Sequence, residues 1–202
     1  MMAQTIAAPL LAAEGPAARL AKRAAVLAFA VAALTISAKI RVAVEPVPVT
    51  MQTLVVVALG LVFGARIGAA GVLAYLAVGA AGWPVFAGTP EKGIGLLYMA
   101  GPTGGYLAGF LASAALVGRL AERGWDRNLW TSTAAMGLGL AALYVPGVLW
   151  LAYGTPAFGA AFGGLGIETA LSVGVMPFLW IDALKLALAA AGFPLIWRLM
   201  GR

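Results

Sequence analysis

Long apolar runs without charged residues divide most of the chain, and short polar stretches separate them. A run of about 20 apolar residues is long enough to cross the hydrocarbon core of a membrane as an α-helix. The pattern predicts six such helices, at residues 20–40, 50–65, 67–82, 95–118, 129–152 and 169–197. Only Gly64, Ala65 and Arg66 separate the second helix from the third, so we expect a tight helical hairpin there.

Two further segments have a composition typical of loops. The first 18 residues are rich in alanine and contain Pro9, Gly15 and Pro16, which predicts a flexible tail (1–18) before a single membrane domain (19–202). After residue 153, a Gly-Thr-Pro sequence followed by further glycines predicts an outer loop. Basic residues before the first apolar run also resemble the beginning of a signal peptide, but the many spans that follow favour a retained first helix.

The composition excludes a soluble domain. Of the 202 residues, 63% are hydrophobic and 10% are charged, whereas a soluble domain usually carries about 25% charged residues. The absence of cysteine and histidine excludes thiolate nucleophiles, imidazole bases and the usual zinc and iron–sulfur ligand sets. The chain also lacks the motif of a nucleotide-binding loop. We therefore expect an all-α integral membrane protein that is not an enzyme and uses neither a cofactor nor a metal ion.

Basic residues lie mainly at the ends of the apolar runs and predict how the helices are oriented. The sequence has 13 Lys and Arg against 7 Asp and Glu, a net charge of +6. With six spans, one side of the membrane receives nine basic residues: Arg19, Lys22, Arg23, Arg66, Arg119, Arg123, Arg127, Arg198 and Arg202. The other side receives three: Lys39, Arg41 and Lys92. Because basic residues are enriched in cytoplasmic loops, we expect both termini in the cytoplasm, and no nucleic-acid partner is needed to explain the charge.

Two charged residues lie inside an apolar run rather than at its end. Asp182 and Lys185 fall within the last predicted span, three residues apart, so their side chains leave the same face of the helix. A charge at membrane depth costs roughly 2.5 to 3.5 kcal/mol on insertion scales. Two interpretations are open. The residues form a self-neutralising ion pair that helps packing, or they line a binding cavity in which Asp182 accepts from ligand N–H groups and Lys185 donates to a ligand oxygen.

The segment Gly-Pro-Thr-Gly-Gly-Tyr at residues 101–106 predicts the beginning of the fourth span. Pro102 suits the first turn of a helix, where its missing N–H leaves no hydrogen bond unmade. The N–H groups of Thr103, Gly104 and Gly105 would then point outward at the positive end of the helix dipole, where they could receive a carboxylate. The glycines also form a small-residue stripe that favours close helix packing, and both roles stay open.

The loops on the outer side offer polar and aromatic side chains. Pro46 and Pro48 predict a stiff, extended connection, from which Thr50 and Gln52 could reach over a pocket as a lid. The next loop places two aromatic side chains at the membrane interface, one of them Phe86.

Two of the predicted helices carry notable side chains at helical spacing. In the fifth span, Tyr144 and Trp150 flank a proline and fit a kinked helix with an aromatic wall. In the first span, Ala24, Ala28 and Ala32 recur every four residues, a stripe that lets another helix approach closely.

Five motifs occur in order along the chain: Pro46-x-Pro48-Val49-Thr50-x-Gln52-Thr53-Leu54, Gly79-Ala80-x-Gly82-x-Pro84-Val85-Phe86-Ala87-Gly88, Gly101-Pro102-Thr103-Gly104-Gly105-Tyr106-Leu107, Pro146-Gly147-x-x-Trp150-Leu151 and Asp182-x-x-Lys185. Together they resemble the BioY family, the biotin-specific substrate-binding (S) component of energy-coupling factor (ECF) transporters. The resemblance extends from about residue 20 to about residue 200.

The resemblance implies a six-helix protein of the bacterial cytoplasmic membrane, surrounded by lipid, that holds biotin in an outward pocket. Its partners would be a transmembrane coupling subunit and two ABC-type ATPases. Through the resemblance, Asp182 and Lys185 become binding residues, and Thr50 and Gln52 belong to the outer-loop motif. The alanine stripe of the first span becomes the surface that meets the coupling subunit. The sequence leaves open whether the chain also forms a homo-oligomer.

Biotin itself restricts how these residues can be used. Its fused ring carries a urea with two N–H groups and one oxygen, and its tail ends in a carboxylate. Two side chains on one helix cannot serve both ends, so we expect Asp182 and Lys185 to hold the urea and residues 103–106 to receive the carboxylate. The opposite assignment, with Lys185 on the carboxylate, stays open. The residues expected to bind substrate are Asp182, Lys185, Thr103, Gly104, Gly105, Tyr106, Phe86 and Trp150.

Three alternatives to biotin uptake have different consequences. An ECF component for another vitamin, such as thiamine, riboflavin or a precursor, would contain a different bound ligand. A membrane enzyme would need Asp182 and Glu168 to face one cavity, and no nucleophile or metal set accompanies them. A purely structural bundle would bind no ligand.

Overall fold

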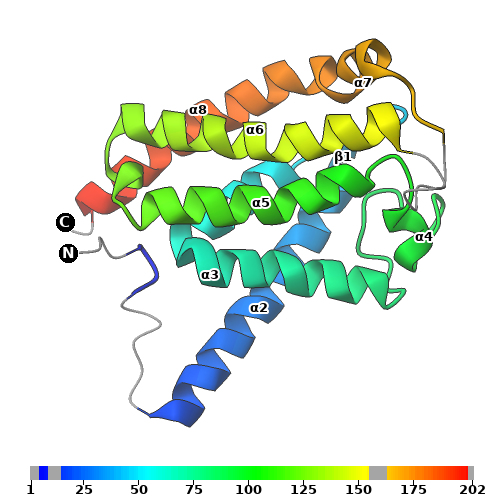
Figure 1. The fold of residues 1–202 in the computed structure, drawn as a ribbon. Helices are drawn as coiled ribbons and strands as arrows, with labels where there is room; N and C mark the ends of the chain where they lie inside the picture. Colours follow the sequence, from blue (N-terminus) through cyan, green and yellow to red (C-terminus); the bar gives the residue numbers. More distant parts are fainter. Residues whose placement is uncertain (1–4, 9–14, 155–162, 200–202) are drawn as a thin grey trace.

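A computed structural model describes residues 5–8, 15–154 and 163–199 (Figure 1). Within these ranges the chain forms seven α-helices, a 3-10 helix and a small sheet. The helices are α2 (Pro16–Lys39), α3 (Gln52–Ala80), α4 (Gly95–Met99), α5 (Gly104–Ala121), α6 (Leu129–Tyr153), α7 (Ile167–Gly174) and α8 (Met176–Leu199). The 3-10 helix is η1 (Trp125–Arg127), and strands β1 (Arg41–Val42) and β2 (Val49–Thr50) pair antiparallel.

Helix α5 lies in the middle of the bundle, with α3 on one side and α6 on the other (Figure 1). Glycines make both contacts close. A Cβ atom at Gly60 of α3 would lie 2.7 Å from the carbonyl oxygen of Ala114, and one at Gly109 of α5 would lie 2.4 Å from that of Leu143. Because a side chain fits in neither place, the helices pack with their backbones nearly in contact.

The expected hairpin between the second and third spans falls inside α3. Gly64 has φ +80° and ψ 177°, a non-helical conformation that interrupts the helix between residues 52–63 and 65–80. Only glycine adopts this conformation without strain. A Cβ atom at Gly68 would lie 2.8 Å from the carbonyl oxygen of Leu59, so the second arm of α3 folds back against the first.

Two predicted spans are each interrupted in the structure. The expected helix at 95–118 consists of the short α4 and the longer α5, because Pro102 has no N–H with which to continue α4. The expected helix at 169–197 consists of α7 and α8, which meet at Val175, and Pro177 lies in the first turn of α8. The prediction of single continuous helices was wrong at these two places, since proline begins a new helix rather than extending the old one.

The remaining helix predictions agree closely with the structure. Helix α6 (Leu129–Tyr153) matches the expected span at 129–152, and the side chain of Asn128 caps it by accepting from the N–H of Trp130 at 2.9 Å. Helix α2 begins at Pro16, within the expected tail, and the backbone N–H of Ala7 donates to the Val62 carbonyl at 3.0 Å. The boundary between tail and membrane domain stays a prediction, and most of the expected outer loop at 155–162 lies outside the described residues.

In the part of the chain that the structure describes, five helices are long and apolar enough to cross a membrane: α2, α3, α5, α6 and α8. The chain is therefore a multi-pass membrane protein. One end of the bundle carries the turn from α5 to α6 and the C-terminal end of α8, and the other carries α4 and α7 (Figure 1). The count of six spans and the cytoplasmic position of both termini stay predictions.

Candidate functional site

The charged residues of α8 form an ion pair inside the protein. Asp182 is 1% exposed and Lys185 is 5% exposed, and Lys185 Nζ lies 2.7 Å from Asp182 Oδ1. Helix α8 places both on one face, as their spacing predicts. A buried ion pair of this kind persists only if further hydrogen bonds satisfy both charged groups.

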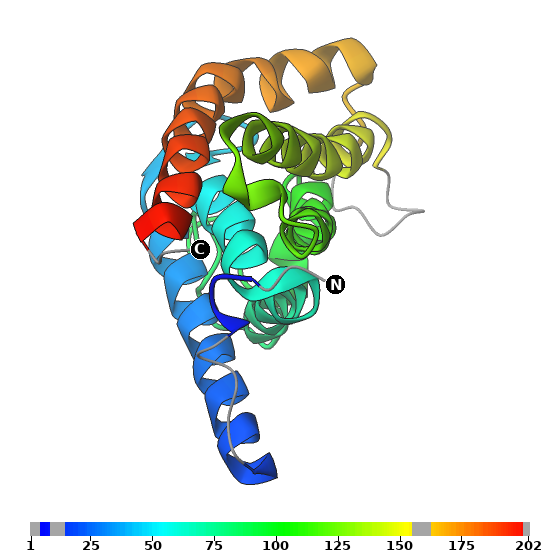
Figure 2. The ribbon, with the colours of Figure 1, turned by 90° about the vertical axis from the view of Figure 1, so that its left-hand side faces the viewer.

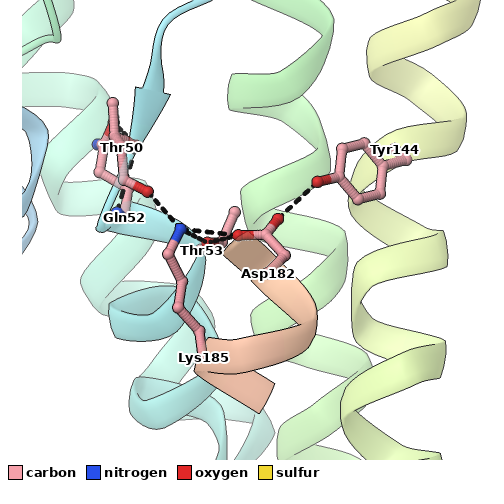
Figure 3. Close-up of polar contacts among 6 residues, drawn as sticks. All are labelled: Thr50, Gln52, Thr53, Tyr144, Asp182 and Lys185. Atoms are coloured by element: carbon pink, nitrogen blue, oxygen red, sulfur yellow. Dashed lines mark hydrogen bonds and ion pairs between the residues drawn. The ribbon is translucent and has the colours of Figure 1, made fainter. Parts of the chain in front are cut away.

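Neighbouring helices provide those hydrogen bonds (Figure 3). Lys185 Nζ also donates to the backbone carbonyl of Thr50 at 2.6 Å and to Thr53 Oγ1 at 3.0 Å, so its three N–H groups have three acceptors. Asp182 accepts from the Thr53 hydroxyl at 2.9 Å and from the Tyr144 hydroxyl at 2.5 Å. The pair therefore joins α8 to the beginning of α3 and to α6.

A largely apolar cavity lies against this network, at the end of the bundle where α3 and α5 begin. It holds about 500 Å³ of free space, counting its open mouth. The lining residues come from the β1–β2 region, from α3 and the loop after it, and from α4, α5, α6 and α8: Val47, Pro48, Thr50, Gln52, Thr53, Ala87, Tyr98, Thr103, Tyr106, Leu107, Phe110, Leu143, Tyr144 and Phe178. Such a cavity, with a few polar groups among apolar walls, is typical of small-molecule sites.

The ion pair lies directly behind one wall of this cavity. Thr50, Thr53 and Tyr144 line the cavity and also hold Asp182 or Lys185. Since the Tyr144 hydroxyl gives its proton to Asp182, its oxygen remains an acceptor for a donor within the cavity. The expected side-chain pair is thus connected to the cavity through hydroxyl groups and does not itself line it.

The expected lid residues are neighbours, and both line the cavity: the backbone N–H of Gln52 donates to the Thr50 hydroxyl at 3.3 Å. Thr50 ends strand β2 and lines the cavity. Gln52 is 4% exposed and its Nε2 donates to the Tyr75 hydroxyl at 2.8 Å. The side chain of Gln52 is therefore held from within the protein by the buried Tyr75 hydroxyl, the partner available to its amide, and a lid role for Thr50 and Gln52 stays a prediction.

Hydrogen bonds from side chains of α2, α3 and α4 hold the loop that follows α3. Tyr75 OH donates to the carbonyl of Val85 at 3.2 Å, and Tyr98 OH donates to that of Ala87 at 2.5 Å. Lys39 Nζ, at the end of α2, donates to the carbonyls of Phe86 and Thr89 at 3.0 and 3.1 Å. These bonds fix the part of the loop in which Ala87 lines the cavity.

Phe86 lies beneath this part of the site. It is fully buried and stacks on Tyr98, with ring centroids 4.9 Å apart. Its ring also fills the place where a Cβ atom at Gly79 would lie. Phe86 therefore supports the lining residue Tyr98 and is not itself among the lining residues. The ring of Phe86 is enclosed by α3 and α4, and its place at the membrane interface stays a prediction.

The four residues expected to receive the carboxylate, at the beginning of α5, fall into two groups by position. Thr103 and Tyr106 line the cavity. Gly104 and Gly105 pack instead, since Cβ atoms there would lie 2.0 Å from the Met99 carbonyl oxygen and 2.3 Å from Trp150 Cβ. The N–H of Gly104 donates to the Gly101 carbonyl at 3.0 Å and does not point outward as expected. The packing interpretation of these glycines thus applies in the structure.

Trp150 has a supporting position as well. Its Nε1 donates to the Gly101 carbonyl at 2.9 Å, which connects α6 to the turn before α5. Trp150 is not among the lining residues, whereas Tyr144 on the same helix lines the cavity. Trp150 therefore positions the beginning of α5 rather than the cavity surface.

Several lining residues were missing from the expected set, above all Tyr98, Phe110, Leu143 and Phe178. In the sequence they look like other apolar residues of a membrane helix, and no spacing sets them apart. Thr53 and Tyr144 had a possible signal, because polar groups in apolar runs need buried partners.

The alanine stripe lies far from the cavity along α2. Ala24, Ala28 and Ala32 are all exposed and spaced four residues apart on this helix. Figure 2 shows the N-terminal half of α2 extending beyond the rest of the bundle. The stripe is therefore available for contact with another molecule.

Comparison with known proteins gives a consistent family match. The family model described as "BioY family" matches residues 5–202. The "Biotin transporter BioY" of Thermotoga maritima is 37% identical over 159 residues, covering 79% of this chain and 86% of the relative. The "Probable biotin transporter BioY" of Pyrococcus horikoshii is 37% identical over 169 residues, covering 84% and 92%. The "Biotin transporter BioY" of Rhizobium etli is 36% identical over 186 residues, covering 85% and 93%.

The fold also matches a solved structure. The crystal structure of the S-component for biotin from an ECF-type ABC transporter superposes with a TM-score of 0.72 at 22% identity. The match covers 94% of this chain and 96% of that one. The two chains therefore share one fold over nearly their whole lengths.

Proposed function

This chain belongs to the BioY family, and on that premise we propose that it binds biotin as the S component of an ECF transporter and takes it up across a membrane. Relatives that carry the name of biotin transporter cover most of the chain. The protein acts by binding and transport and not as an enzyme. Its ligand is the transported vitamin, and the site needs no cofactor.

One observation of this chain carries the proposal: a wall of hydroxyl groups backed by a buried ion pair, in a cavity that is otherwise apolar. The urea of biotin has two N–H donors and one acceptor oxygen, and the rest of its ring system is apolar. The hydroxyl oxygens of Thr53 and Tyr144 can accept from the urea N–H groups, and the charge of Asp182 strengthens them as acceptors. Lys185 lies behind this wall, and its ammonium group donates to the urea oxygen by exchanging one of its present acceptors, the Thr50 carbonyl or the Thr53 hydroxyl.

In this arrangement the valerate tail extends toward the beginning of α5. Thr103 and Tyr106 line that side of the cavity and offer polar groups to a carboxylate. No arginine lies among the lining residues, so the carboxylate is held by hydrogen bonds or reaches water at the open mouth. The alternative places Lys185 on the carboxylate and the urea near α5.

Biotin methyl ester distinguishes these two arrangements. Esterification removes the carboxylate charge, so it weakens binding most where a cation holds the carboxylate. If the ester loses the same factor in affinity with wild type and with Lys185→Ala, Lys185 does not hold the carboxylate. A loss seen in wild type and absent in Lys185→Ala would reverse the assignment.

Isothermal titration of the purified protein with biotin tests the proposed function. We expect saturable binding of one biotin per chain, with thiamine and riboflavin failing to compete. Mass spectrometry of the ligand that copurifies with the protein is the second measurement. Another vitamin in that position would overturn biotin specificity, and no binding by well-folded protein would overturn the function itself.

We place the protein in the bacterial cytoplasmic membrane with both termini inside the cell, together with a transmembrane coupling subunit and two ABC-type ATPases. The exposed stripe of Ala24, Ala28 and Ala32 supports a helix–helix contact with the coupling subunit. Replacing Ala28 with leucine should prevent close approach and abolish copurification with the coupling subunit, while biotin titration stays unchanged. A homo-oligomer of this chain would appear in the same purification as a complex without the coupling subunit.

A further inference from the structure

An open hollow lies between α2 and α3, at the end of the bundle opposite the biotin cavity. It holds about 900 Å³, counting its mouth. Its walls include Arg23 and Leu27 of α2, and Phe63, Arg66 and Ile67 beside the turn of α3. Figures 1 and 2 show the N-terminal part of α2 standing away from the other helices here.

The two arginines give this hollow a positive charge. Within residues 5–8, 15–154 and 163–199, neither Arg23 nor Arg66 has a hydrogen bond or an ion pair. Among the described residues that line the hollow there is one carboxylate, Glu122, whose Oε1 already accepts from the backbone N–H of Ala65 at 2.9 Å. That bond holds the backbone just after the Gly64 kink and leaves two guanidinium groups without a matching anion.

The rest of the hollow is apolar and continues onto the outer face of α2. Only Ala30, Leu34, Ser37 and Ala38 of this helix are buried. Phe63 packs edge-on against Phe29 of α2, with ring centroids 6.5 Å apart, and Phe29 is 59% exposed. A small soluble anion has no apolar part that could contact these walls, whereas a phospholipid combines an anionic phosphate with hydrocarbon chains.

We propose that this hollow binds an anionic phospholipid. Arg23 and Arg66 hold the phosphate, since guanidinium groups match phosphate oxygens in a two-pronged geometry. An acyl chain lies along Leu27, Phe63 and Ile67. The lipid then fills the space between α2 and the turn of α3 and ties the two together. This site does not depend on the identity of the vitamin.

Native mass spectrometry of the protein released from nanodiscs tests this proposal. We compare nanodiscs of phosphatidylglycerol with nanodiscs of phosphatidylcholine, for wild type, Arg23→Ala, Arg66→Ala and the double variant. Wild type should retain phosphatidylglycerol in preference to phosphatidylcholine. Each substitution should weaken retention about fivefold, because one arginine at an anionic lipid surface contributes about 1 kcal/mol.

Arg198→Ala is the matched control, since Arg198 is an exposed arginine of α8 that does not line the hollow. It should leave lipid retention unchanged. An equal loss with Arg198→Ala, or equal retention of the two lipids by wild type, would overturn the proposal. Glycerol phosphate, which has the same phosphate without acyl chains, should fail to compete, and effective competition would indicate a soluble phosphate site instead.

The coupling subunit is the other molecule that could occupy this surface. If the double variant loses copurification with the coupling subunit while retaining phosphatidylglycerol as wild type does, the hollow is a protein contact and the lipid proposal fails. Biotin titration of the same variants should match wild type and reports their folding. If wild type itself does not bind biotin, that result contradicts the proposed function and leaves the lipid proposal unaffected.

Discussion

The ion pair of Asp182 and Lys185 is stable in an apolar protein because each charged group is fully hydrogen-bonded. Three acceptors surround the ammonium group, and two hydroxyl groups and the ammonium group donate to the carboxylate. Removing one charge would leave the other buried without compensation. Both interpretations that the sequence allowed, packing and ligand binding, can therefore apply to one pair of residues, and mutation separates them.

Replacing Lys185 alone with methionine should destabilise the protein by about 3 to 5 kcal/mol, because Asp182 is left as an uncompensated buried charge. The double variant Asp182→Asn with Lys185→Met removes both charges; its amide oxygen can accept from one of the two hydroxyl groups, Thr53 or Tyr144, and its NH2 group can donate to the other. We expect the double variant to recover most of the thermal stability but not biotin binding. Thermal unfolding in detergent and biotin titration measure the two effects.

Asp182→Asn alone is the second single variant of this double-mutant cycle. It should also destabilise the protein, because it leaves the ammonium group of Lys185 buried without an anionic partner. If the double variant binds biotin as tightly as wild type, the pair serves packing only. The ligand-binding role of Asp182 and Lys185 would then be wrong.

The helices are positioned by close backbone contacts and by hydrogen bonds from one element to the next. Tyr106 combines both: its hydroxyl donates to the Gly174 carbonyl at 2.9 Å, and its ring lies where a Cβ at Gly147 would be. Since Tyr106 also lines the cavity, the packing of α5, α6 and α7 sets the shape of the site. Glycine substitutions within these contacts should therefore affect both stability and binding.

Gly109→Ala should lower the melting temperature and weaken biotin binding, because its Cβ would lie 2.4 Å from the Leu143 carbonyl oxygen on α6. Overpacking of this kind typically costs about 1 to 3 kcal/mol. Gly137→Ala is the matched control, since no atom lies within 4 Å of a Cβ there and alanine favours a helix. Equal melting temperatures for the two variants would contradict close packing of α5 on α6.

Lys39→Met should weaken biotin binding by about tenfold, since a hydrogen bond from a charged group contributes roughly 1.5 to 3 kcal/mol. Lys39 holds the carbonyls of Phe86 and Thr89, and without it the loop around Ala87 loses its connection to α2. Lys92→Met is the control on the same loop, because Lys92 pairs with the largely exposed Glu45 at 2.6 Å. Exposed pairs contribute about 0 to 1 kcal/mol. Equal titration results for both lysine variants would exclude a special role for Lys39.

At the scale of the whole molecule, the two ends of the bundle differ in chemistry. The biotin cavity opens at the end that carries α4 and the β1–β2 hairpin, and the positively charged hollow lies at the end that carries the kink of α3. The predicted cytoplasmic side is the second of these ends. Because basic residues favour the cytoplasmic side of a membrane, the predicted orientation has the cavity open outward, toward a nutrient to be taken up.

Single-cysteine variants test this orientation, because the natural sequence contains no cysteine to interfere. Glu91→Cys, in the loop before α4, should react with a membrane-impermeant maleimide in intact cells. Arg123→Cys, in the turn after α5, should react only after the membrane is permeabilised. Both residues are exposed, so accessibility to solvent does not separate them. The reverse labelling pattern would invert the predicted topology.

Asp126, at the basic end of the bundle, makes the stability of the folded protein depend on pH. Burial raises the pKa of this carboxyl above its usual value, while Trp197 Nε1, which donates to Oδ2 at 2.6 Å, acts in the opposite direction. A raised folded-state pKa means that the folded protein holds the proton more tightly than the unfolded one. The contribution to stability is thus present at low pH and is lost as pH rises through the folded-state pKa.

Asp126→Asn should therefore melt at a higher temperature than wild type at pH 7, because the amide imitates the neutral acid and keeps an oxygen for Trp197. The advantage should shrink as pH falls toward the ordinary range of a carboxyl group. Asp126→Ala is the control, since it removes the charge and the hydrogen bond together. A constant difference between Asp126→Asn and wild type at every pH would contradict a buried carboxyl with a raised pKa.

Much of the fold and part of the site could be predicted from local pattern. Apolar runs located the long helices, Gly64 located the kink of α3, and the spacing of Asp182 and Lys185 predicted a shared helix face. Local pattern did not indicate which side chains a partner far along the chain holds in place. Gln52 turned inward because Tyr75, 23 residues away, offers a buried hydroxyl.

The sequence by itself determined that this chain lies in a membrane and how its apolar segments divide. It also showed that two charged residues occur inside a membrane span, where a single unpaired charge is energetically costly. Those properties follow from composition and from periodicity along one helix, which involve only near neighbours. Only the tertiary structure decided which side chains face the cavity: it brought Thr53, Tyr144 and Asp182 together across up to 129 residues of chain. A binding site is made by elements that meet in space, and an apolar sequence contains no local signal for which faces will meet.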